Sequence, residues 1–387
     1  MNGTLLKFLV NYLKDRKQCV IIGGSKSGFK NVRSGVPQGS ILGPLLFVLY
    51  INDMSDCIHE GTNIALYADD TKIWRRIVTW SDHEVLQSDI NALQNWAEIN
   101  KMKFHPDKCK VLSISNKNTE KSDWSMFPFQ VFIYTLGEFE LDYCSQEKDL
   151  GTIVTNDLTW EAQINALCSR ASSRLGLMKR TLYFIKNPKQ KRVFYLALTR
   201  SLFEHNCIVW RPLTSQLTVK VESIQKRAVK WILNELDHHY NNYEYFNRLR
   251  DLDLMPMSYK LDYTDLVFFH SIFHGSSVIS LPPYITSMSI NERHRLKSNV
   301  MPPDRLGSAG ITASGLRNHN ELRNNRCDEL SLRSTVEKRA HSFGTSFFFR
   351  THSRWNDLPM SLKNEFRNDV FQTNLKKYFW EFVIEPD

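Results

Sequence analysis

Apolar residues recur every three or four positions along several stretches of the chain, which is the spacing of an amphipathic helix. The longest of these stretches runs from Trp160 to about Arg180. Its apolar stripe consists of Ile164, Leu167, Ala171, Leu175 and Met178. The same spacing predicts helices over residues 4–14, 189–206, 217–233 and 258–273.

A further helix is predicted after residue 80. Ser81 with Glu84 fits a capping box, in which side chains three residues apart bond each other's backbone N–H groups. The apolar stripe that follows consists of Leu86, Ile90, Leu93 and Ala97.

Short apolar runs predict two pairs of strands. Those on either side of Asp69 and Asp70 predict a β-hairpin over residues 64–75, with the two carboxylates in its turn. The runs Val131–Tyr134 and Leu150–Val154 predict a second strand pair.

Residues 33–44 are too rich in glycine and proline for a regular element. A helix follows them, because Pro44 suits a first helical turn and an unbroken apolar run extends from Leu45 to Ile51. Since this run is apolar on every side, we expect the helix to be buried.

The composition is that of a globular protein with two or three domains, with 42% hydrophobic and 24% charged residues among 387. Lys and Arg exceed Asp and Glu by 50 to 41, which gives a formal charge of +9. Such an excess favours polyanionic partners, but a solvated basic surface without a partner is nearly as common. No apolar stretch approaches the roughly 18 residues that cross a bilayer, so we expect no membrane partner.

Seven cysteines are scattered along the chain without a Cys-x-x-Cys pair. Their odd number and irregular spacing argue against a disulfide framework and against a zinc site. We expect reduced thiols in an intracellular protein and no disulfide-linked partner. Residues 116–130 and 290–340 are polar. We expect a domain boundary at the first and a loose segment at the second.

The strongest chemical signal is the sequence from Tyr67 to Asp70 at the predicted hairpin tip. Two adjacent carboxylates at an open turn offer the hard oxygen ligands that Mg²⁺ prefers, and they leave room for substrate phosphates. In phosphoryl transfer, two such ions roughly 3.5–4 Å apart clamp the attacking and leaving oxygens. An Asp-Asp dipeptide by itself is more often a solvated turn, so its sequence context decides.

That context is the loop Gly35–Ser40, which opens the apolar helix. Its glycines let the backbone approach a ligand closely, and Gln38 supplies both a donor and an acceptor. Together the two motifs resemble the reverse transcriptases of non-LTR retrotransposons, the jockey-like lineage in particular. The matching text is Ser34–Phe47, Tyr50–Asp53 and Leu66–Thr71, with weaker similarity at Asp149–Gly151, Ile224–Ala228 and Trp355–Pro359.

The resemblance implies an α+β fold in which a partial polymerase palm precedes a mostly helical thumb and C-terminal region. The implied domains are residues 1–116 (partial palm), 117–240 (primer grip, thumb and connection) and 241–387 (helical, with the loose basic segment). The implied activity is RNA-directed DNA synthesis. A primer 3′-OH is extended with deoxynucleotides on an RNA template, under catalysis by two Mg²⁺ ions.

By the same resemblance, Asp69 is a catalytic metal ligand and Asp70 is its neighbour with a lesser metal role. Tyr67 would lie beside the primer terminus. Gln38 and the backbone around Gly39 would border the incoming nucleotide.

Further residues are assigned to substrate contact by resemblance. Lys108 would contact the leaving pyrophosphate, although a loop lysine is more often simply solvated. The implied thumb would contact the nucleic-acid backbone through basic residues that lie off the apolar stripes, although such a face is also commonly just solvated. These residues are Arg170, Arg174, Arg180, Lys226 and Arg227.

One element of the family pattern is missing. A reverse transcriptase palm needs a third carboxylate on a strand that precedes the Val-Pro-Gln-Gly loop by some tens of residues. The only acidic residue before Gly35 is Asp15, which follows a helix and has the wrong neighbours. We therefore expect an N-terminally truncated palm with impaired catalysis. Two other classes stay open: an inactive nucleic-acid-binding remnant, and a transposon relic that does not fold.

Overall fold

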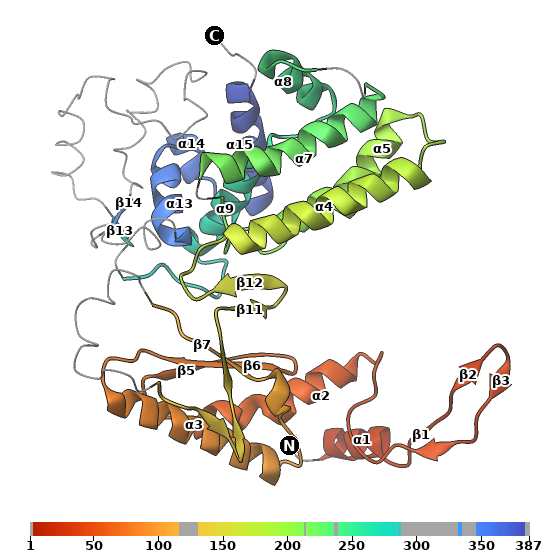
Figure 1. The fold of residues 1–387 in the computed structure, drawn as a ribbon, viewed down its shortest axis with the longest axis vertical. Coiled ribbons are helices and arrows are strands. Elements are labelled where there is room, and N and C mark those ends of the chain that lie inside the picture. The colour runs from red at the N-terminus through yellow and green to blue at the C-terminus, as the bar shows by residue number, and fades with distance from the viewer. Residues whose placement is uncertain are drawn as a thin grey trace. The chain divides into compact units, whose positions relative to one another are not determined.

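The computed structural model describes residues 3–115, 131–212, 214–235, 239–283, 285–287, 332–334 and 346–383. The chain forms two compact units. Unit 1 comprises residues 1–111 and 124–143, and unit 2 comprises residues 112–123 and 144–387. Unit 1 mixes helices with strands, whereas unit 2 is mostly helical (Figure 1). The α+β class is thereby confirmed, while the division into palm, thumb and C-terminal region stays a prediction.

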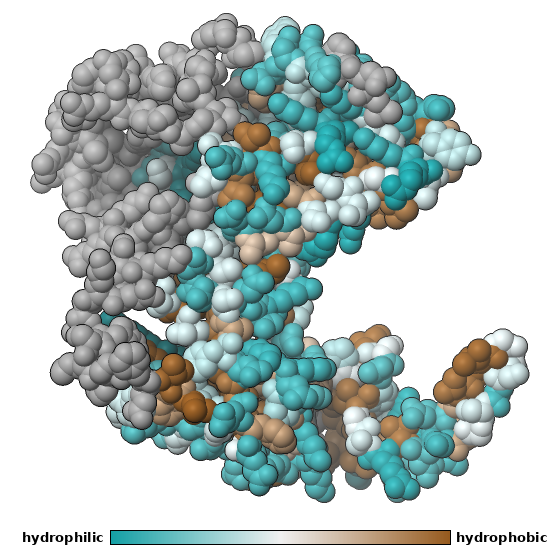
Figure 2. Space-filling model, in the orientation of Figure 1, coloured by the Kyte–Doolittle hydropathy of each residue, from teal (hydrophilic) through white to brown (hydrophobic). Residues whose placement is uncertain are grey.

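Unit 1 begins with the predicted helix, α1 (Thr4–Leu13), and continues as a thin two-stranded ribbon. Glycine suits the turn of this ribbon because Gly23 and Gly24 both have positive φ, 55° and 85°. Apolar side chains lie exposed along it (Figure 2). Its strands are β1 (Lys17–Gln18) paired with β4 (Lys30–Asn31), and β2 (Ile21–Ile22) paired with β3 (Ser25–Lys26).

Helix α2 (Leu42–Ile51) forms where predicted, but the expectation that it is buried was wrong. Ile51 is 4% exposed, whereas Leu45 and Leu49 are 59% and 58% exposed. Phe47 and Ile51 of α2 contribute to a small core, whereas Leu45, Val48 and Leu49 of the same helix are exposed. An apolar run cannot show by itself which of its faces will be covered.

The predicted hairpin is present. Strands β5 (Thr62–Tyr67) and β6 (Asp70–Arg75) pair antiparallel, and the 3-10 helix η1 (Asn52–Cys57) connects α2 to them. Helix α3 (Trp80–Ile99) packs beneath the hairpin. The fully buried residues of this core are Ile51, Met54, Leu93, Trp96 and Ala97.

The capping box of α3 is not the predicted one. Thr79 caps the helix and pairs with Asp82, whose carboxylate accepts from the backbone N–H groups of Thr79 (2.8 Å) and Val78 (3.0 Å). These hydrogen bonds lower the pKa of Asp82 to about 2. Ser81 and Glu84 have the same spacing, so the local pattern could not decide between the two pairs.

The second predicted strand pair was wrong in its partners. Val131–Tyr134 is not a strand, and β12 (Thr152–Thr155) pairs instead with β11 (Gln146–Asp149). Each of the two regions forms a hairpin between neighbours in sequence instead of pairing with the other region. Gly137 and Gly151, with φ of 65° and 88°, provide the tight turns of these two hairpins. The remaining short elements are η2 (Pro106–Lys108), β7 (Lys110–Leu112), β8 (Thr135–Leu136), β9 (Phe139–Glu140) and β10 (Asp142–Cys144).

Unit 2 is built on α4 (Glu161–Thr181), whose predicted stripe is buried from Ile164 to Met178. The helices predicted near 189, 217 and 258 are present, and α8 (Asn242–Asp251) was missed. The other elements are α5 (Pro188–Tyr195), the π-helix η4 (Leu196–Arg200), α6 (Ser201–Glu204), α7 (Ser215–Leu233), α9 (Met257–Phe273), β13 (Ile285–Ser287), β14 (Leu332–Ser334), α13 (Phe347–Asn356), α14 (Met360–Lys363) and α15 (Asn368–Val383).

Buried ion pairs attach the C-terminal helices to α9. Arg350 of α13 forms two hydrogen bonds with Asp265, Nε to Oδ2 at 2.9 Å and Nη2 to Oδ1 at 3.1 Å. Its Nη2 also donates to the carbonyl of Ile208 at 2.7 Å. Arg211 lies 3.7 Å from the same carboxylate and pairs with Asp262.

Other sequence expectations have a mixed outcome. The cysteines that the structure describes are all free thiols. No helix in the described ranges is both long and apolar enough to cross a membrane. The predicted boundary at 116–130 lies outside the described residues, and so does the loose segment at 290–340 apart from β14.

Candidate active site

Asp69 and Asp70 lie at the tip of the β5–β6 hairpin. Tyr67 pairs with Asp70 across the two strands, which leaves Ala68 and Asp69 as the turn. Both carboxylates are exposed, and the Tyr67 ring beside them is 66% exposed. The pair therefore lies at the solvent-accessible tip of the hairpin as predicted, with Asp69 in the turn and Asp70 as the first residue of β6.

The turn itself is strained at Ala68. Its φ of 52° lies in the left-handed region, which costs an L-residue roughly 1–2 kcal/mol. Such a conformation persists only where the surrounding structure enforces it, and strained residues cluster at functional sites. Here the paired strands on both sides hold the turn. Nothing in the periodicity of the sequence pointed to Ala68.

The two carboxylates fit part of a Mg²⁺ site. Mg²⁺ keeps several waters and binds through one or two carboxylates together with substrate phosphates, and an exposed Asp pair permits this. Within the residues that the structure describes, no group of three or more His, Cys, Asp or Glu side chains is arranged to hold a metal ion. The hairpin can therefore supply two ligands of a larger set.

The loop before α2 is fixed by its own contacts. The Ser40 hydroxyl donates to the Pro37 carbonyl at 2.7 Å and accepts from the Gly43 N–H at 2.9 Å. A Cβ at Gly43 would lie 2.7 Å from the Pro37 carbonyl oxygen, so only glycine fits there. No pattern in the sequence pointed to this role of Gly43, although the residue lies within the matching text.

The nucleotide-binding candidates of this loop are accessible. Gln38 and Gly39 are both exposed, and Gly39 has a φ of 74°. Their position next to the Asp69 carboxylate stays a prediction. Lys108, at the end of η2, is exposed as well.

A second candidate surface lies on unit 2, where α4 and α7 run side by side in the same direction. Lys220 of α7 donates to the side chain of Asn165, and Arg227 donates to Ser172 at 3.2 Å. The second pair lies seven residues after the first on each helix, which is about 10.5 Å along the helix axis. Since the acceptors are an amide and a hydroxyl, neither contact neutralises the positive charge of Lys220 or Arg227.

This surface continues toward the C-terminal end of α4. Burial lowers the pKa of Lys179, and so do the nearby positive charges of Arg227 and Lys230. Like charges this close are costly unless an anion joins them. The structure therefore brings basic side chains from two helices into one cationic cluster.

The predicted contact residues are divided around these helices. Arg170, Arg174, Arg180 and Arg227 are exposed. Arg174 also donates to the Leu198 carbonyl at 2.9 Å. Lys226 points toward α8 instead, with its ammonium 5.0 Å from the centre of the Tyr245 ring.

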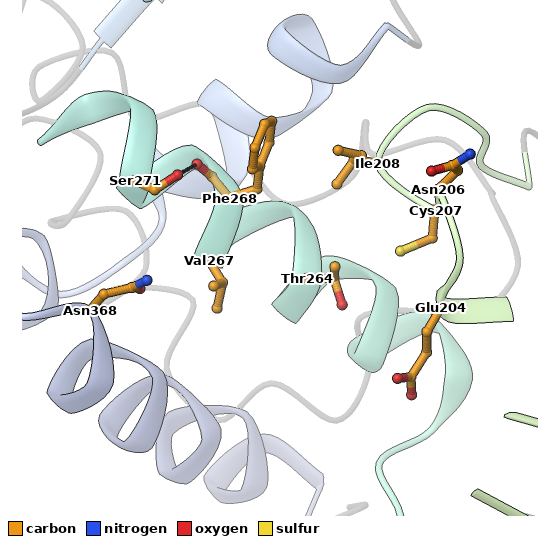
Figure 3. Close-up of a pocket in the computed structure, with 9 residues that line it drawn as sticks. All are labelled: Glu204, Asn206, Cys207, Ile208, Thr264, Val267, Phe268, Ser271 and Asn368. Carbon is orange, nitrogen blue, oxygen red and sulfur yellow. Dashed lines mark hydrogen bonds between the residues drawn. The ribbon is translucent and has the colours of Figure 1, made fainter. Parts of the chain in front are cut away.

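Unit 2 also has a pocket of about 370 Å³ between α6, α9 and the start of α15 (Figure 3). Burial raises the pKa of the Cys207 thiol to about 11, so this group is not a nucleophile at neutral pH. The Ser271 hydroxyl donates to the Phe268 carbonyl. Neither Cys207 nor Ser271 is therefore an activated nucleophile in this pocket.

Comparison with known proteins decides the family. The model of the family described as reverse transcriptase (RNA-dependent DNA polymerase) matches residues 4–199, about half of the chain. The chain belongs to this reverse transcriptase family. The matched residues include the loop Gly35–Ser40, the β5–β6 hairpin and α4.

Several mobile-element polymerases are similar to this reverse transcriptase chain, as its motifs predicted. The RNA-directed DNA polymerase from mobile element jockey of Drosophila melanogaster is 32% identical over 114 residues, 28% of this chain and 12% of that protein. Its counterpart in Drosophila funebris is 28% identical over 187 residues, which cover 46% of this chain and 19% of that protein. The probable RNA-directed DNA polymerase from transposon BS of Drosophila melanogaster is 27% identical over 237 residues, which cover 58% of this chain and 25% of that protein. The matches therefore span a quarter or less of each relative.

Proposed function

We propose that this chain is part of a retrotransposon polymerase that extends a primer 3′-OH with deoxynucleotides on an RNA template. The observation that carries the proposal is the exposed Asp69-Asp70 pair at a hairpin tip, inside the region that matches the reverse transcriptase family. The relatives named as RNA-directed DNA polymerases of mobile elements support the same reaction.

In this proposal Asp69 and Asp70 hold Mg²⁺, which activates the 3′-OH and neutralises charge on the transferred phosphate. Tyr67 lies beside the primer terminus, where its exposed ring is available for contact. Gln38 and Gly39 border the nucleotide, and Lys108 meets the leaving pyrophosphate. Two ions need more carboxylate than one Asp pair supplies, so a further ligand completes the site.

Primer extension with Mg²⁺ on an RNA template tests the catalytic part. Asp69→Asn removes one negative charge, and the matched control is Asp56→Asn, an exposed carboxylate outside the hairpin. We expect no useful synthesis by residues 1–387 alone. Fusing an upstream polymerase segment that carries an Asp-bearing strand should restore it. The absence of that carboxylate ligand should lower the rate by on the order of a hundredfold.

The rescued chain then gives the decisive comparison. Asp69→Asn should abolish its synthesis, and Asp56→Asn should not. Equal synthesis by both variants would refute the metal role of Asp69. A titration with paramagnetic Mn²⁺ gives a readout without catalysis, because amide resonances of the hairpin should broaden in the parent chain and not in the Asp69→Asn variant.

The nucleic-acid part of the proposal rests on α4 and α7. Arg170, Arg174, Arg180 and Arg227 would contact phosphates, joined by Lys226 where the strand passes α8. Each phosphate contact releases counterions, so the affinity for nucleic acid should fall steeply as salt rises. Replacing Arg227 with Ala should weaken binding and flatten that dependence. An affinity that is constant between low and high salt would refute this part.

A further inference from the structure

The connection between α4 and α5 projects from the rest of unit 2 (Figure 1). At its end the side chains of Tyr183 and Phe184 are 71% and 65% exposed. Their rings meet edge to face, with centres 5.9 Å apart and planes at 86°. Contiguous exposed apolar side chains of this kind are typical of binding sites.

The exposure is built into the turn. Ile185 N–H donates to the Leu182 carbonyl at 3.1 Å, so Tyr183 and Phe184 are the two central residues. Leu182 packs against the core of unit 2, and Ile185 is half-buried. The flanking apolar side chains anchor the turn while the aromatic pair points outward.

Contacts at its base make this turn rigid. The Asn234 side chain, at the C-terminal end of α7, donates to the Lys186 carbonyl at 3.3 Å. The buried Lys191 ammonium donates to the Trp231 carbonyl at 2.9 Å and to the Asn234 side chain. A fixed backbone at this turn reduces the conformational entropy that is lost on binding.

The charge around the turn identifies the kind of partner. Residues 162–203 contain nine Lys and Arg and no Asp or Glu. In the described part of the chain, the ion pairs of this run are those of Arg192 with Asp253 and of Arg200 with Glu204. Four basic residues flank the aromatic pair on both sides without such a partner: Lys179, Arg180, Lys186 and Lys189.

We propose that the α4–α5 turn is a stacking site for unpaired bases of single-stranded nucleic acid. Tyr183 and Phe184 offer ring faces and edges to the bases, and the flanking cations hold the adjacent phosphates. This pairing of aromatic rings with a basic track is how sequence-tolerant single-strand binding works. The inference rests on the proposed nucleic-acid function, and it adds base stacking to phosphate contact.

The test separates bases from phosphates. Residues 1–387 are titrated into a labelled single-stranded DNA and into an abasic strand with the same number of phosphates. The parent chain should bind the strand with bases more tightly, by about tenfold for each base that stacks. Tyr183→Ala/Phe184→Ala should remove this difference and leave abasic binding unchanged. The matched control is Tyr243→Ala, an exposed tyrosine (59%) on α8.

Two further measurements make the outcome decisive. Tyr183→Phe/Phe184→Tyr keeps both rings and should bind as the parent chain does, and thermal unfolding should show the Ala variant folded. Equal, salt-dependent affinity of the parent chain for both strands would overturn the stacking site and leave the phosphate surface standing. Binding to neither strand would overturn both. Binding to phosphatidylserine vesicles is measured in parallel. If the Ala variant loses only vesicle binding and keeps its affinity for both strands, the turn is a membrane contact and the proposal is overturned.

Discussion

The ion pair of Arg350 with Asp265 offers a quantitative test of how α13 is held to unit 2. The side chains are 16% and 5% exposed, and three hydrogen bonds converge on the guanidinium. Arg350→Ala would remove these bonds and leave the Asp265 carboxylate buried. Arg211 would still lie 3.7 Å from the Asp265 carboxylate.

The expected cost follows from that geometry. Breaking a buried pair by deleting one partner typically costs 3–5 kcal/mol, because the surviving charge lacks compensation. Since Arg211 still neutralises part of it, we expect about 3 kcal/mol. For a unit of this size, that lowers the unfolding temperature by about 6–12 °C.

Thermal unfolding followed by tryptophan fluorescence measures this, because Trp355 is fully buried on the same helix. The matched control is Arg354→Ala. Arg354 lies one turn later, is 63% exposed and reaches Asp262 at 3.5 Å, so its loss should cost less than about 1 kcal/mol. Replacing both Arg350 and Asp265 with apolar residues should recover most of the stability. Equal effects of the two Arg→Ala changes would refute the argument.

Three further outcomes are expected. Burial lowers the pKa of His270, so the folded state keeps it neutral. The contribution of His270 to stability should be constant above about pH 6.5 and fall below it, and His270→Phe should reduce the acid-induced loss of stability measured by urea denaturation. Ala68→Gly should preserve or stabilise the hairpin, whereas Ala68→Val should destabilise it by about 1 kcal/mol or more, seen in amide exchange. Lys191→Met should cost roughly 1–3 kcal/mol in thermal unfolding, because the Trp231 carbonyl loses its buried donor.

Local patterns in the sequence were sufficient for the elements and for the position of the Asp pair. The stripe Ile164–Met178 is buried as its spacing predicted, because helical periodicity alone fixes which side chains share a face. The hairpin around Asp69 and Asp70 formed because alternating apolar strands need only each other to pair. These outcomes depend on residues that are close in sequence.

Tertiary structure decided whatever depends on residues far apart in the chain. Leu45 and Leu49 look like core residues yet are exposed, while Lys191 and Lys363 look like surface residues yet are 3% and 0% exposed. The two lysines are buried because they donate to the carbonyls of Trp231 and Asn356, at the ends of α7 and α13. The sequence around a lysine cannot show that a helix end will lie beside it. Burial of a charge is therefore settled only when the fold supplies the acceptor.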